Sequence, residues 1–326
     1  MVDEGVRVVR AGLQTTLQDW PGRVGFWRYG IPPSGPMDSL SFRLANRLVG
    51  NDVGTTALEY QFIGPELEFL EALSIALVGG QSSPTLDGRP VPMGRVLAVK
   101  PGQRLACGAV REGARAYLAV AGGFAKPKVL GSTATFARAS IGGTALVQDS
   151  VLALADPETR CVGCALASHD TIIAKGQPLA VEVVAGPHLD WLSYSGLSTI
   201  LGATWKVSSR SDRTGIRLDG PALEFSRRAH EKSADNGLDP TNVINTGYAI
   251  GGVNICGGTP IILPVDGPSQ GGFITPIVVA SAALCKVGQL RPNQGIVFRR
   301  VSLDEAIDLR RALDARVANE AIEVSP

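Results

Sequence analysis

Polar residues that could take part in chemistry gather in two Gly/Pro-rich loops, one near each end of the chain. The early set is Arg28, Ser34 and Asp38, and the late set is Asn254, Asp266, Ser269, Gln270, Lys286 and Gln289. Asp266 ends an apolar run and precedes GPSQGG, so its carboxylate would lie beside exposed backbone N–H groups. Such N–H groups can stabilise an oxyanion, although an Asp at this place can equally close an Asx turn.

The segment 267–271 also matches the G-x-S-x-G pattern of a nucleophile elbow. That elbow needs a strand before the serine and a helix after it, with a histidine later in the chain. Here the following segment, GFITPIVVA, is β-branched and contains Pro276, and no histidine comes after His230. A structural turn or an anion-binding loop is therefore favoured over a hydrolase elbow.

Cysteine and histidine give weaker signals. Cys161, Cys164 and His169 could supply three zinc ligands, but a structural zinc site needs four, so incidental cysteines are favoured and no metal is predicted. His188 is interpreted as a helix cap or a core histidine, with a catalytic role as the alternative. The five cysteines, an odd number, fit a reducing compartment.

Several function classes are excluded by what the sequence lacks. It contains no Gly-rich nucleotide-binding loop and no methionine followed by lysine for biotin attachment. The 31 basic and 30 acidic residues give no nucleic-acid footprint. Asp3 and Glu4 oppose a signal peptide, and the most apolar segment, 272–285, is shorter than the roughly 20 residues of a membrane helix. A cytoplasmic protein without membrane or nucleic-acid partners is expected.

Two globular units must position these loops, because 326 residues exceed what one core usually holds. IGPELEF (63–69) returns as DGPALEF (219–225), and KPGQRL (100–105) is echoed by LRPNQGIVF (290–298), which indicates an internal duplication. Short apolar runs between turn residues predict strands. These runs are Leu73–Val78, Arg95–Val99, Ala116–Val120, Val181–Val184 and Ile261–Val265.

Helices are expected to be few. Asp38 can cap a helix whose apolar residues Leu40, Leu44 and Leu48 share one face, with Gly50 at its end. Ser302 and Glu305 form a capping-box pair that predicts a C-terminal helix. The result is a mainly β fold of the barrel or sandwich type.

Longer motifs carry a resemblance to a known family. These are GLQTTLQDWPGRVGFWRYGIPPSGPMD, FRLANRLVGN, GPELEF, RAYLAVAGGF with LGSTATF, SDRTGIRLDGP, and DGPSQGGF followed by KVGQLRP. Through them nearly the whole chain resembles the biotin-dependent carboxyltransferase family, also called allophanate hydrolase subunit 2, and most closely the carboxyltransferase segment of urea carboxylase. The resemblance implies two cyclophilin-like β-barrel units, assigned here to residues 1–178 and 179–326.

The resemblance also implies carboxyl transfer from carboxybiotin, carried by a separate protein, to urea or a similar small amide. Such chemistry needs donors for the biotin ureido oxygen and a group that orients or deprotonates the acceptor. Residue chemistry within the motifs suggests Asp266, Ser269 and Lys286 as catalytic residues. It suggests Arg28, Ser34, Asp38, Asn254, Gln270 and Gly271 as substrate-binding residues.

The expected partners are a protein similar to allophanate hydrolase subunit 1, a biotin carrier and a biotin carboxylase on other chains. Two alternatives stay open, namely a subunit of an ATP-dependent 5-oxoprolinase complex and a non-catalytic inhibitor of a sensor kinase. Gly258 and Gln270 depart from the residues expected in urea carboxylases, so the acceptor need not be urea.

Overall fold

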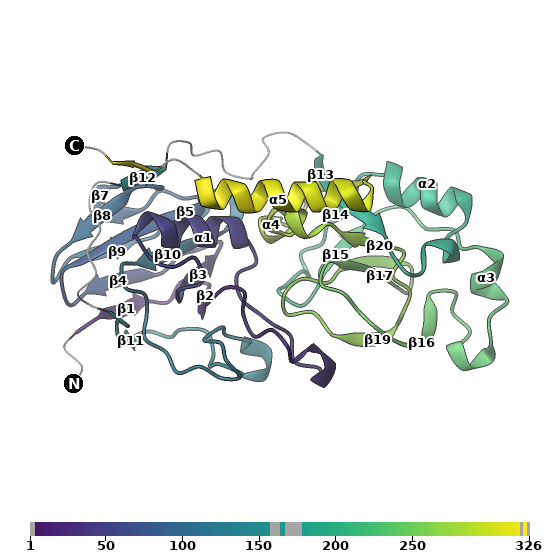
Figure 1. Ribbon diagram of the computed structural model, residues 1–326, viewed down its shortest axis with the longest axis horizontal. Helices are drawn as coiled ribbons and strands as arrows, with labels where there is room; N and C mark the ends of the chain where they lie inside the picture. Colours follow the sequence, from purple (N-terminus) through teal and green to yellow (C-terminus); the bar gives the residue numbers. More distant parts are fainter. Residues whose placement is uncertain (1–3, 157–163, 167–177, 320–321, 325–326) are drawn as a thin grey trace. The chain divides into compact units, whose positions relative to one another are not determined.

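The computed structural model describes residues 4–156, 164–166, 178–319 and 322–324 (Figure 1). By its internal contacts the chain divides into two compact units, and each unit is made of segments that are not continuous in the sequence. Unit 1 comprises Met1–Val24, Pro33–Ile173 and Ala315–Pro326, and unit 2 comprises Gly25–Pro32 and Ala174–Asp314. Each unit therefore contains a segment that is distant in sequence from the rest of it.

Unit 1 is built from two antiparallel sheets with a common apolar core. The first has the order β11-β1-β4-β9-β6-β7 and the second the order β2-β3-β10-β5-β8. The first sheet contains β1 (Val6–Arg10), β4 (Glu66–Phe69), β6 (Thr85–Leu86), β7 (Arg89–Pro90), β9 (Arg104–Ala106) and β11 (Val151–Leu152). The second contains β2 (Gln14–Gln18), β3 (Ala57–Gln61), β5 (Leu73–Gln81), β8 (Val96–Val99) and β10 (Glu112–Val120).

The central strands of unit 1 are buried on both faces. One face of β5 and β10 contributes to the core, and helix α1 (Ser39–Leu48) packs against the same two strands. A strand covered on both sides is expected to be a continuous apolar run, which is how LSIALV and YLAV read. Strand β12 (Cys164–Leu166) pairs with β22 (Ile322–Val324) in a separate ladder.

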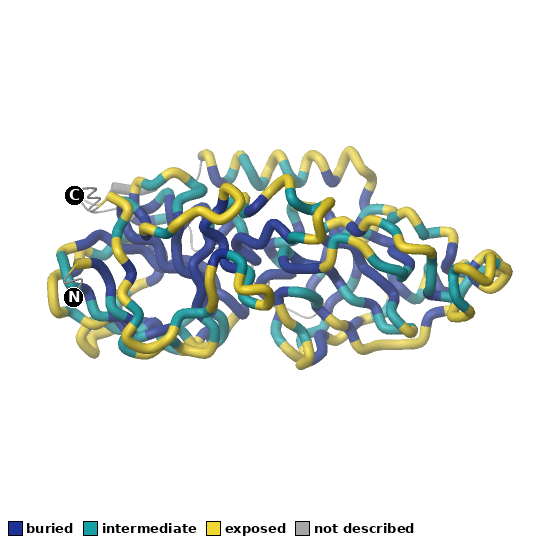
Figure 2. The backbone as a smooth tube through the Cα atoms, turned by 90° about the horizontal axis from the view of Figure 1, so that it is seen from below, coloured by how far each residue is buried: buried dark blue, intermediate teal, exposed yellow. Residues whose placement is uncertain are grey.

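Unit 2 contains a closed seven-stranded barrel with the order β13-β20-β17-β18-β15-β14-β21. Its strands are β13 (Leu179–Ala185), β14 (Trp205–Val207), β15 (Ile216–Asp219), β17 (Gly252–Cys256), β18 (Thr259–Ile262), β20 (Ile277–Val279) and β21 (Gly295–Arg300). The pair β13/β21 is parallel and the other pairs are antiparallel. Closure leaves no strand edge unpaired. Buried residues lie in the interior of each unit, and exposed residues lie on its outside (Figure 2).

Shorter elements complete the two units. Unit 2 has a separate ladder of β16 (Asn242–Gly247) with β19 (Gln270–Phe273), and the helices α2 (Tyr194–Gly202), α3 (Arg227–His230) and α4 (Leu284–Gly288). The long helix α5 (Leu303–Asn319) begins in unit 2 and ends in unit 1. The 3₁₀ turns are η1 (Trp27–Tyr29), η2 (Ala137–Ala139), η3 (Leu189–Trp191), η4 (Ala234–Asn236) and η5 (Ser281–Ala283).

The mainly β prediction is confirmed, and so are the two predicted helices. Asp38 caps α1, the leucines of its apolar face are buried, and Gly50 follows with a positive φ of 79°. The Ser302 hydroxyl accepts from the N–H of Glu305 at 3.1 Å at the start of α5. None of the helices in the described part of the chain combines the length and apolar character needed to cross a bilayer.

One of the two sequence echoes corresponds to equivalent structure. The turns at 100–103 and 291–294 each lead into a strand, β9 and β21. The other echo differs, because residues 66–69 form β4 whereas 221–225 lie outside the named strands. In unit 2 strand β15 has already ended at Asp219, and Phe225 makes only an isolated bridge to Leu192.

Candidate functional site

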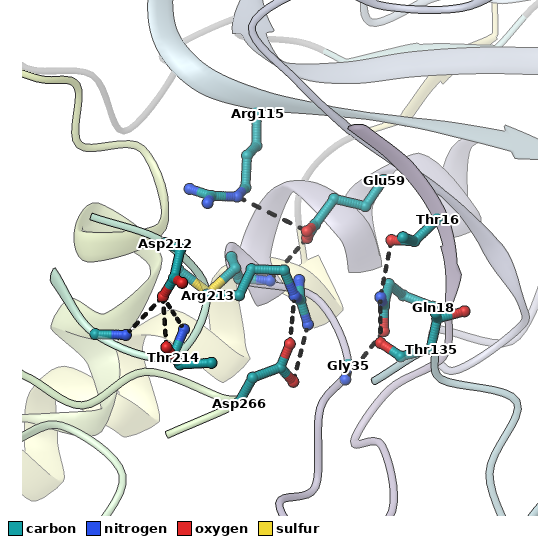
Figure 3. A network of polar contacts seen from close by, with 12 residues as sticks. Thr16, Gln18, Gly35, Glu59, Arg115, Thr135, Asp212, Arg213, Thr214 and Asp266 are labelled. Atoms are coloured by element: carbon teal, nitrogen blue, oxygen red, sulfur yellow. Dashed lines mark hydrogen bonds and ion pairs between the residues drawn. The ribbon is translucent and has the colours of Figure 1, made fainter. Parts of the chain in front are cut away.

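A buried ion pair fixes the carboxylate of Asp266 in unit 2. The Arg213 Nε donates to Oδ2 of Asp266 at 2.7 Å and Nη2 donates to Oδ1 at 3.4 Å (Figure 3). The two side chains are only 7% and 4% exposed. A two-point contact of this kind fixes orientation as well as charge. The carboxylate is thus held in one orientation by the guanidinium. This suits a group that accepts hydrogen bonds better than one that must move in order to remove a proton.

The loop that carries Arg213 is ordered by its neighbour. Asp212 Oδ1 accepts from the N–H groups of Thr214 and Gly215, at 2.7 and 3.1 Å, and from the Thr214 hydroxyl at 2.6 Å. This is an Asx turn, in which the Asp side chain replaces a backbone partner. Arg213 was missed as a site residue, although it lies in the SDRTGIRLDGP motif. An arginine beside an Asp-x-Thr-Gly turn was the available signal.

The loop that carries Asp266 is held at both ends. The N–H of Asp266 donates to the Arg213 carbonyl at 3.1 Å, and the Ser269 carbonyl accepts from the N–H of Tyr248 at 2.8 Å. Between them, the N–H of Gly267 donates to the Pro264 carbonyl at 2.9 Å, so this predicted oxyanion donor is already used within the turn. Ser269 is partly exposed and the neighbouring Gln270 is exposed.

Gly271 has a packing role beside Tyr248. A Cβ on Gly271 would lie 2.7 Å from the Tyr248 hydroxyl oxygen and 2.8 Å from Cε2, so only glycine fits there. The same hydroxyl accepts from the N–H of Phe273 at 2.7 Å. Burial raises the pKa of Tyr248, which keeps the phenol neutral. Trp27, from the early loop, donates its indole N–H to the Tyr248 carbonyl at 2.8 Å.

Asn254 belongs to a short row of polar groups inside unit 2. Its Oδ1 accepts from the Thr275 hydroxyl at 2.8 Å, and the N–H of Thr275 donates to Nδ1 of His188 at 3.1 Å. An imidazole that accepts at Nδ1 carries its proton on Nε2. Burial lowers the pKa of His188, with the Asp190 charge opposing this shift. His188 starts η3 but makes no side-chain cap.

Lys286 is occupied by an ion pair. Its ammonium donates to both oxygens of Glu182, at 2.8 and 2.9 Å, and to the Ala180 carbonyl at 3.1 Å. Burial alone would raise the pKa of Glu182, but the hydrogen bonds and charge of Lys286, aided by Arg299, hold it below its usual value. These contacts make Lys286 a support for strand β13. Arg28 is exposed, and its guanidinium lies over the ring of Tyr29 at 4.7 Å.

In unit 1 both carboxylate oxygens of Asp38 serve helix α1. Oδ1 accepts from the N–H groups of Leu40 and Ser41, each at 3.1 Å, and Oδ2 accepts from the Ser41 hydroxyl at 2.6 Å. The N–H of Asp38 donates to the Tyr117 oxygen at 2.8 Å, and the Tyr117 hydroxyl donates to Glu59 at 2.9 Å. Burial raises the pKa of Tyr117, so the phenol stays a neutral donor.

Both side-chain oxygens of Asp38 are hydrogen-bonded, but the side-chain hydroxyl of Ser34 has no partner among the described residues. The residue is 2% exposed, and its Oγ makes no hydrogen bond within the described part of the chain. Its φ of 57° is uncommon for a residue other than glycine. The loop is held by Gln18, whose Oε1 accepts from the N–H of Gly35 at 3.1 Å and whose Nε2 donates to the Thr135 carbonyl (Figure 3). A strained residue with an orphaned hydroxyl is a candidate ligand contact.

The described residues offer no candidate metal site. Among the residues it describes, no three His, Cys, Asp or Glu side chains are grouped so as to hold an ion. Cys161 and His169, named above as possible ligands, lie outside the described residues. Cys107, Cys256 and Cys285 form no disulfide.

Comparison with known proteins places this architecture among carboxyltransferases. The model of the carboxyltransferase domain, subdomain A and B, matches residues 29–300. The urea amidolyase of Saccharomyces cerevisiae is 37% identical over 322 residues, which cover 96% of this chain and 17% of the yeast protein. A 5-oxoprolinase subunit of Escherichia coli is 32% identical over 311 residues, which are 94% of both chains.

A solved structure agrees with these matches. The Kluyveromyces lactis urea carboxylase superposes with a TM-score of 0.90 at 37% identity, and the match covers 97% of this chain and 29% of that one. The chain thus spans less than a third of the urea carboxylase and less than a fifth of the yeast amidolyase, but nearly all of the bacterial 5-oxoprolinase chain.

Proposed function

Because the chain belongs to the family of carboxyltransferase domains with subdomains A and B, we propose that it moves a carboxyl group from carboxybiotin to urea or a similar small acceptor of the amide type. The observation that carries this proposal is the match of nearly the entire chain, in sequence and in structure, to one region of urea carboxylase. Carboxybiotin, held by a carrier on another chain, supplies the activated carboxyl group.

Asp266 is proposed to orient the acceptor. Its carboxylate is ion-paired with Arg213 and thereby fixed in direction, and a fixed anion can accept hydrogen bonds from the N–H groups of an amide-type acceptor. The contact would polarise the N–H bonds of the nucleophilic nitrogen. Ser269, on the same loop and partly exposed, is proposed as a second contact for the acceptor.

Ser34 is proposed to donate to a ligand oxygen that carries negative charge. A buried hydroxyl without a partner is costly to keep, by about 1–3 kcal/mol in the folded protein. The cost is offset when a ligand oxygen accepts from it. Donors of this kind contribute roughly 10²–10³-fold to the rate when they meet an oxygen that becomes more negative in the transition state.

Other chains are part of the proposal. We expect a partner similar to allophanate hydrolase subunit 1, together with a biotin carrier and a biotin carboxylase. Support comes from the names of the relatives, because urea amidolyase contains far more chain than the matched region and the bacterial relative is named as one subunit.

A second function has a specific observation in its favour. The E. coli 5-oxoprolinase chain is matched over 94% of its own length, so the two chains correspond end to end. In that case this chain would act in 5-oxoproline hydrolysis, and a separate protein would have to use ATP. The two functions differ in reaction and in substrate, carboxyl transfer to urea in one and ATP-dependent hydrolysis of 5-oxoproline in the other.

The test is acceptor-dependent loss of carboxybiotin in the presence of the partner protein. Urea-dependent loss would support carboxyl transfer, and ATP-dependent consumption of 5-oxoproline without carboxybiotin would replace it by the second function. Within an active assembly, Ser34→Ala should lower kcat by about 100-fold while leaving the free energy of unfolding unchanged or raised, because it removes an unsatisfied hydroxyl.

Ser132→Ala is the matched control for that variant. Ser132 is equally buried, but its hydroxyl donates to Asp19 at 2.5 Å. Its loss should cost about 1–3 kcal/mol of stability by leaving a carboxylate under-satisfied. Equal stability losses for the two serine variants, or a Ser34→Ala protein with full activity, would remove Ser34 from the proposed mechanism.

A further inference from the structure

Strands β2, β3 and β10 of unit 1 carry a row of buried polar side chains on one face of their sheet. The three strands are neighbours, and Glu59 of β3 lies opposite Thr16 of β2 on one side and Tyr117 of β10 on the other. Gln18 is two residues from Thr16, so it shares this face, and its Nε2 donates to the Thr16 hydroxyl oxygen at 2.9 Å (Figure 3). Gln18, Glu59 and Tyr117 are 0%, 3% and 0% exposed. Polar groups buried this deeply are expected to have polar partners.

The first partners of this row are backbone N–H groups of the segment 33–38. Gln18 Oε1 accepts from the N–H of Gly35 at 3.1 Å. Glu59 Oε2 accepts from the N–H of Met37 at 2.8 Å. Two neighbouring strands thus each hold one residue of the same loop.

The third strand holds the end of this loop. The Tyr117 oxygen accepts from the N–H of Asp38 at 2.8 Å, while its hydroxyl donates to Glu59 Oε2 at 2.9 Å. Pro36 has no N–H. Three of the four N–H groups in residues 34–38 are therefore held by side chains of the row.

The row does more than start helix α1. The Asp38 carboxylate already satisfies the N–H groups of Leu40 and Ser41. The row instead holds residues that precede or form the cap, where Ser34 has a φ of 57° and Gly35 a φ of 81°. A serine in the left-handed region persists only where its surroundings fix it. The Ser34 hydroxyl, which makes no hydrogen bond within the described residues, belongs to the segment that is fixed in this way.

We propose that Gln18, Glu59 and Tyr117 are positioning residues, which hold the Ser34 hydroxyl in place for a ligand oxygen. This inference rests on the role proposed above for Ser34. A donor stabilises a transition state most when it need not reorganise as charge develops on the oxygen. A displacement of about 1 Å can cost about 100-fold in rate. The three side chains would act through the backbone of the loop and need not touch the substrate.

A double-mutant cycle of Tyr117→Phe with Ser34→Ala separates positioning from a purely structural role. The assay uses the active assembly and whichever of urea and 5-oxoproline it consumes. We expect Tyr117→Phe to lower kcat by at least about ten-fold with little change in KM, because the displaced hydroxyl of Ser34 acts in the transition state. In the Ser34→Ala background the same change should lower kcat by less than about two-fold, because no donor is left to misplace.

Thr56→Val is the matched control. The hydroxyls of Thr56 and Thr133 are hydrogen-bonded to each other at 2.8 Å, and both residues are buried in unit 1. Thr56→Val should lower the melting temperature, as Tyr117→Phe does, but change kcat by less than about two-fold in both backgrounds. If Tyr117→Phe is unfolded at the assay temperature, Gln18→Met takes its place in the cycle, since it removes the acceptor for the N–H of Gly35.

An equal loss of kcat for Tyr117→Phe in the two backgrounds, or no loss in either, would overturn the inference and leave the proposed function standing. A fully active Ser34→Ala protein would overturn the role of Ser34 and this inference together, and the single variant already shows it.

The hold on the loop is also measurable without any activity. In the full wild-type chain, amide hydrogen exchange of residues 34–38 should be at least about 100-fold slower than in an unstructured peptide. Unprotected exchange of this segment would overturn the inference.

Discussion

At the scale of single residues, the ion pair of Arg213 with Asp266 sets the character of the candidate site. A carboxylate held at 2.7 Å by a buried guanidinium is poorly suited to act as a mobile base. It is well suited to accept hydrogen bonds in one fixed direction. Mutation of either member of the pair should have a large effect, because removing one partner leaves the other charge buried without compensation.

Arg213→Ala should therefore destabilise unit 2 by about 3–5 kcal/mol, the usual cost of breaking a buried pair. Urea unfolding followed by the fluorescence of the tryptophans measures the change. Arg217→Ala is the control, since that arginine is exposed on the adjoining strand β15. A loss of less than about 1 kcal/mol for Arg213→Ala would mean that the pair contributes little to the fold.

His188 gives the protein a dependence on pH with a defined sign. Burial lowers the pKa of the folded-state imidazole below its usual value of about 6.5, so the unfolded chain binds the proton more readily. Stability should then fall as the pH drops through about 6.5 and keep falling until the folded-state group is itself protonated. Protonation also removes the acceptor for the N–H of Thr275.

The expected result is a smaller loss of stability between pH 7.5 and 5 in His188→Asn than in the wild type. The Asn Oδ1 can take the place of Nδ1 as an acceptor and does not titrate. His230→Asn should keep the wild-type slope, because His230 is exposed on α3. Parallel pH profiles for the wild type and His188→Asn would contradict this assignment.

At the scale of elements, helix α1 depends on one fully buried cap. Asp38 satisfies two backbone N–H groups at the start of the helix, where no intrahelical partner exists. Asp38→Ala should cost about 2 kcal/mol, the upper part of the range for caps, because the freed N–H groups are buried. Thermal unfolding measures this loss of stability, with Asp52→Ala as the control because Asp52 is exposed. An equal loss in both variants would mean that the Asp38 cap does not stabilise the helix.

Elements defined by local patterns were predictable from the sequence, and contacts between distant residues were not. The helix after Asp38 follows from its cap and its i, i+4 leucines, and strand β5 from an unbroken apolar run. The partners of Asp266 and of the Trp27 indole are 53 and 221 residues away. The turn around Arg213 marks that arginine as held in place, but nothing local to Arg213 or Tyr248 says which distant residue it contacts. The unpartnered state of Ser34 likewise depends on the residues folded around it.

Packing gives two of the predicted site residues contacts that their residue types do not reveal. Gly271 makes room for the ring of Tyr248. The ammonium of Lys286 is paired with Glu182.

At the scale of the whole molecule, the closed barrel of unit 2 contains one tightly packed tryptophan, Trp205 of strand β14. The indole is fully buried and donates to the Ile200 carbonyl at 3.0 Å, and a Cβ on Gly220 would lie 2.4 Å from its Cε3. Gly220→Ala should cost about 1–3 kcal/mol through overpacking. Gly202→Ala is the control, because open space surrounds that residue and alanine favours the helix it ends, by about 0.5–1 kcal/mol. The differences are read from melting temperatures, and a neutral Gly220→Ala would mean that the indole can shift.

The hydrogen bond from Trp27 to Tyr248 has a consequence for how the protein is made. Unit 2 includes Gly25–Pro32, and unit 1 includes Ala315–Pro326 with its strand β22. Domains usually fold in turn as they leave the ribosome, the first before the second. Here the early tryptophan segment must wait for residues 174–314 to be made, and unit 1 must wait for residues 315–326. Cleavage into two halves at any one peptide bond between the two units would leave each half without a piece of itself.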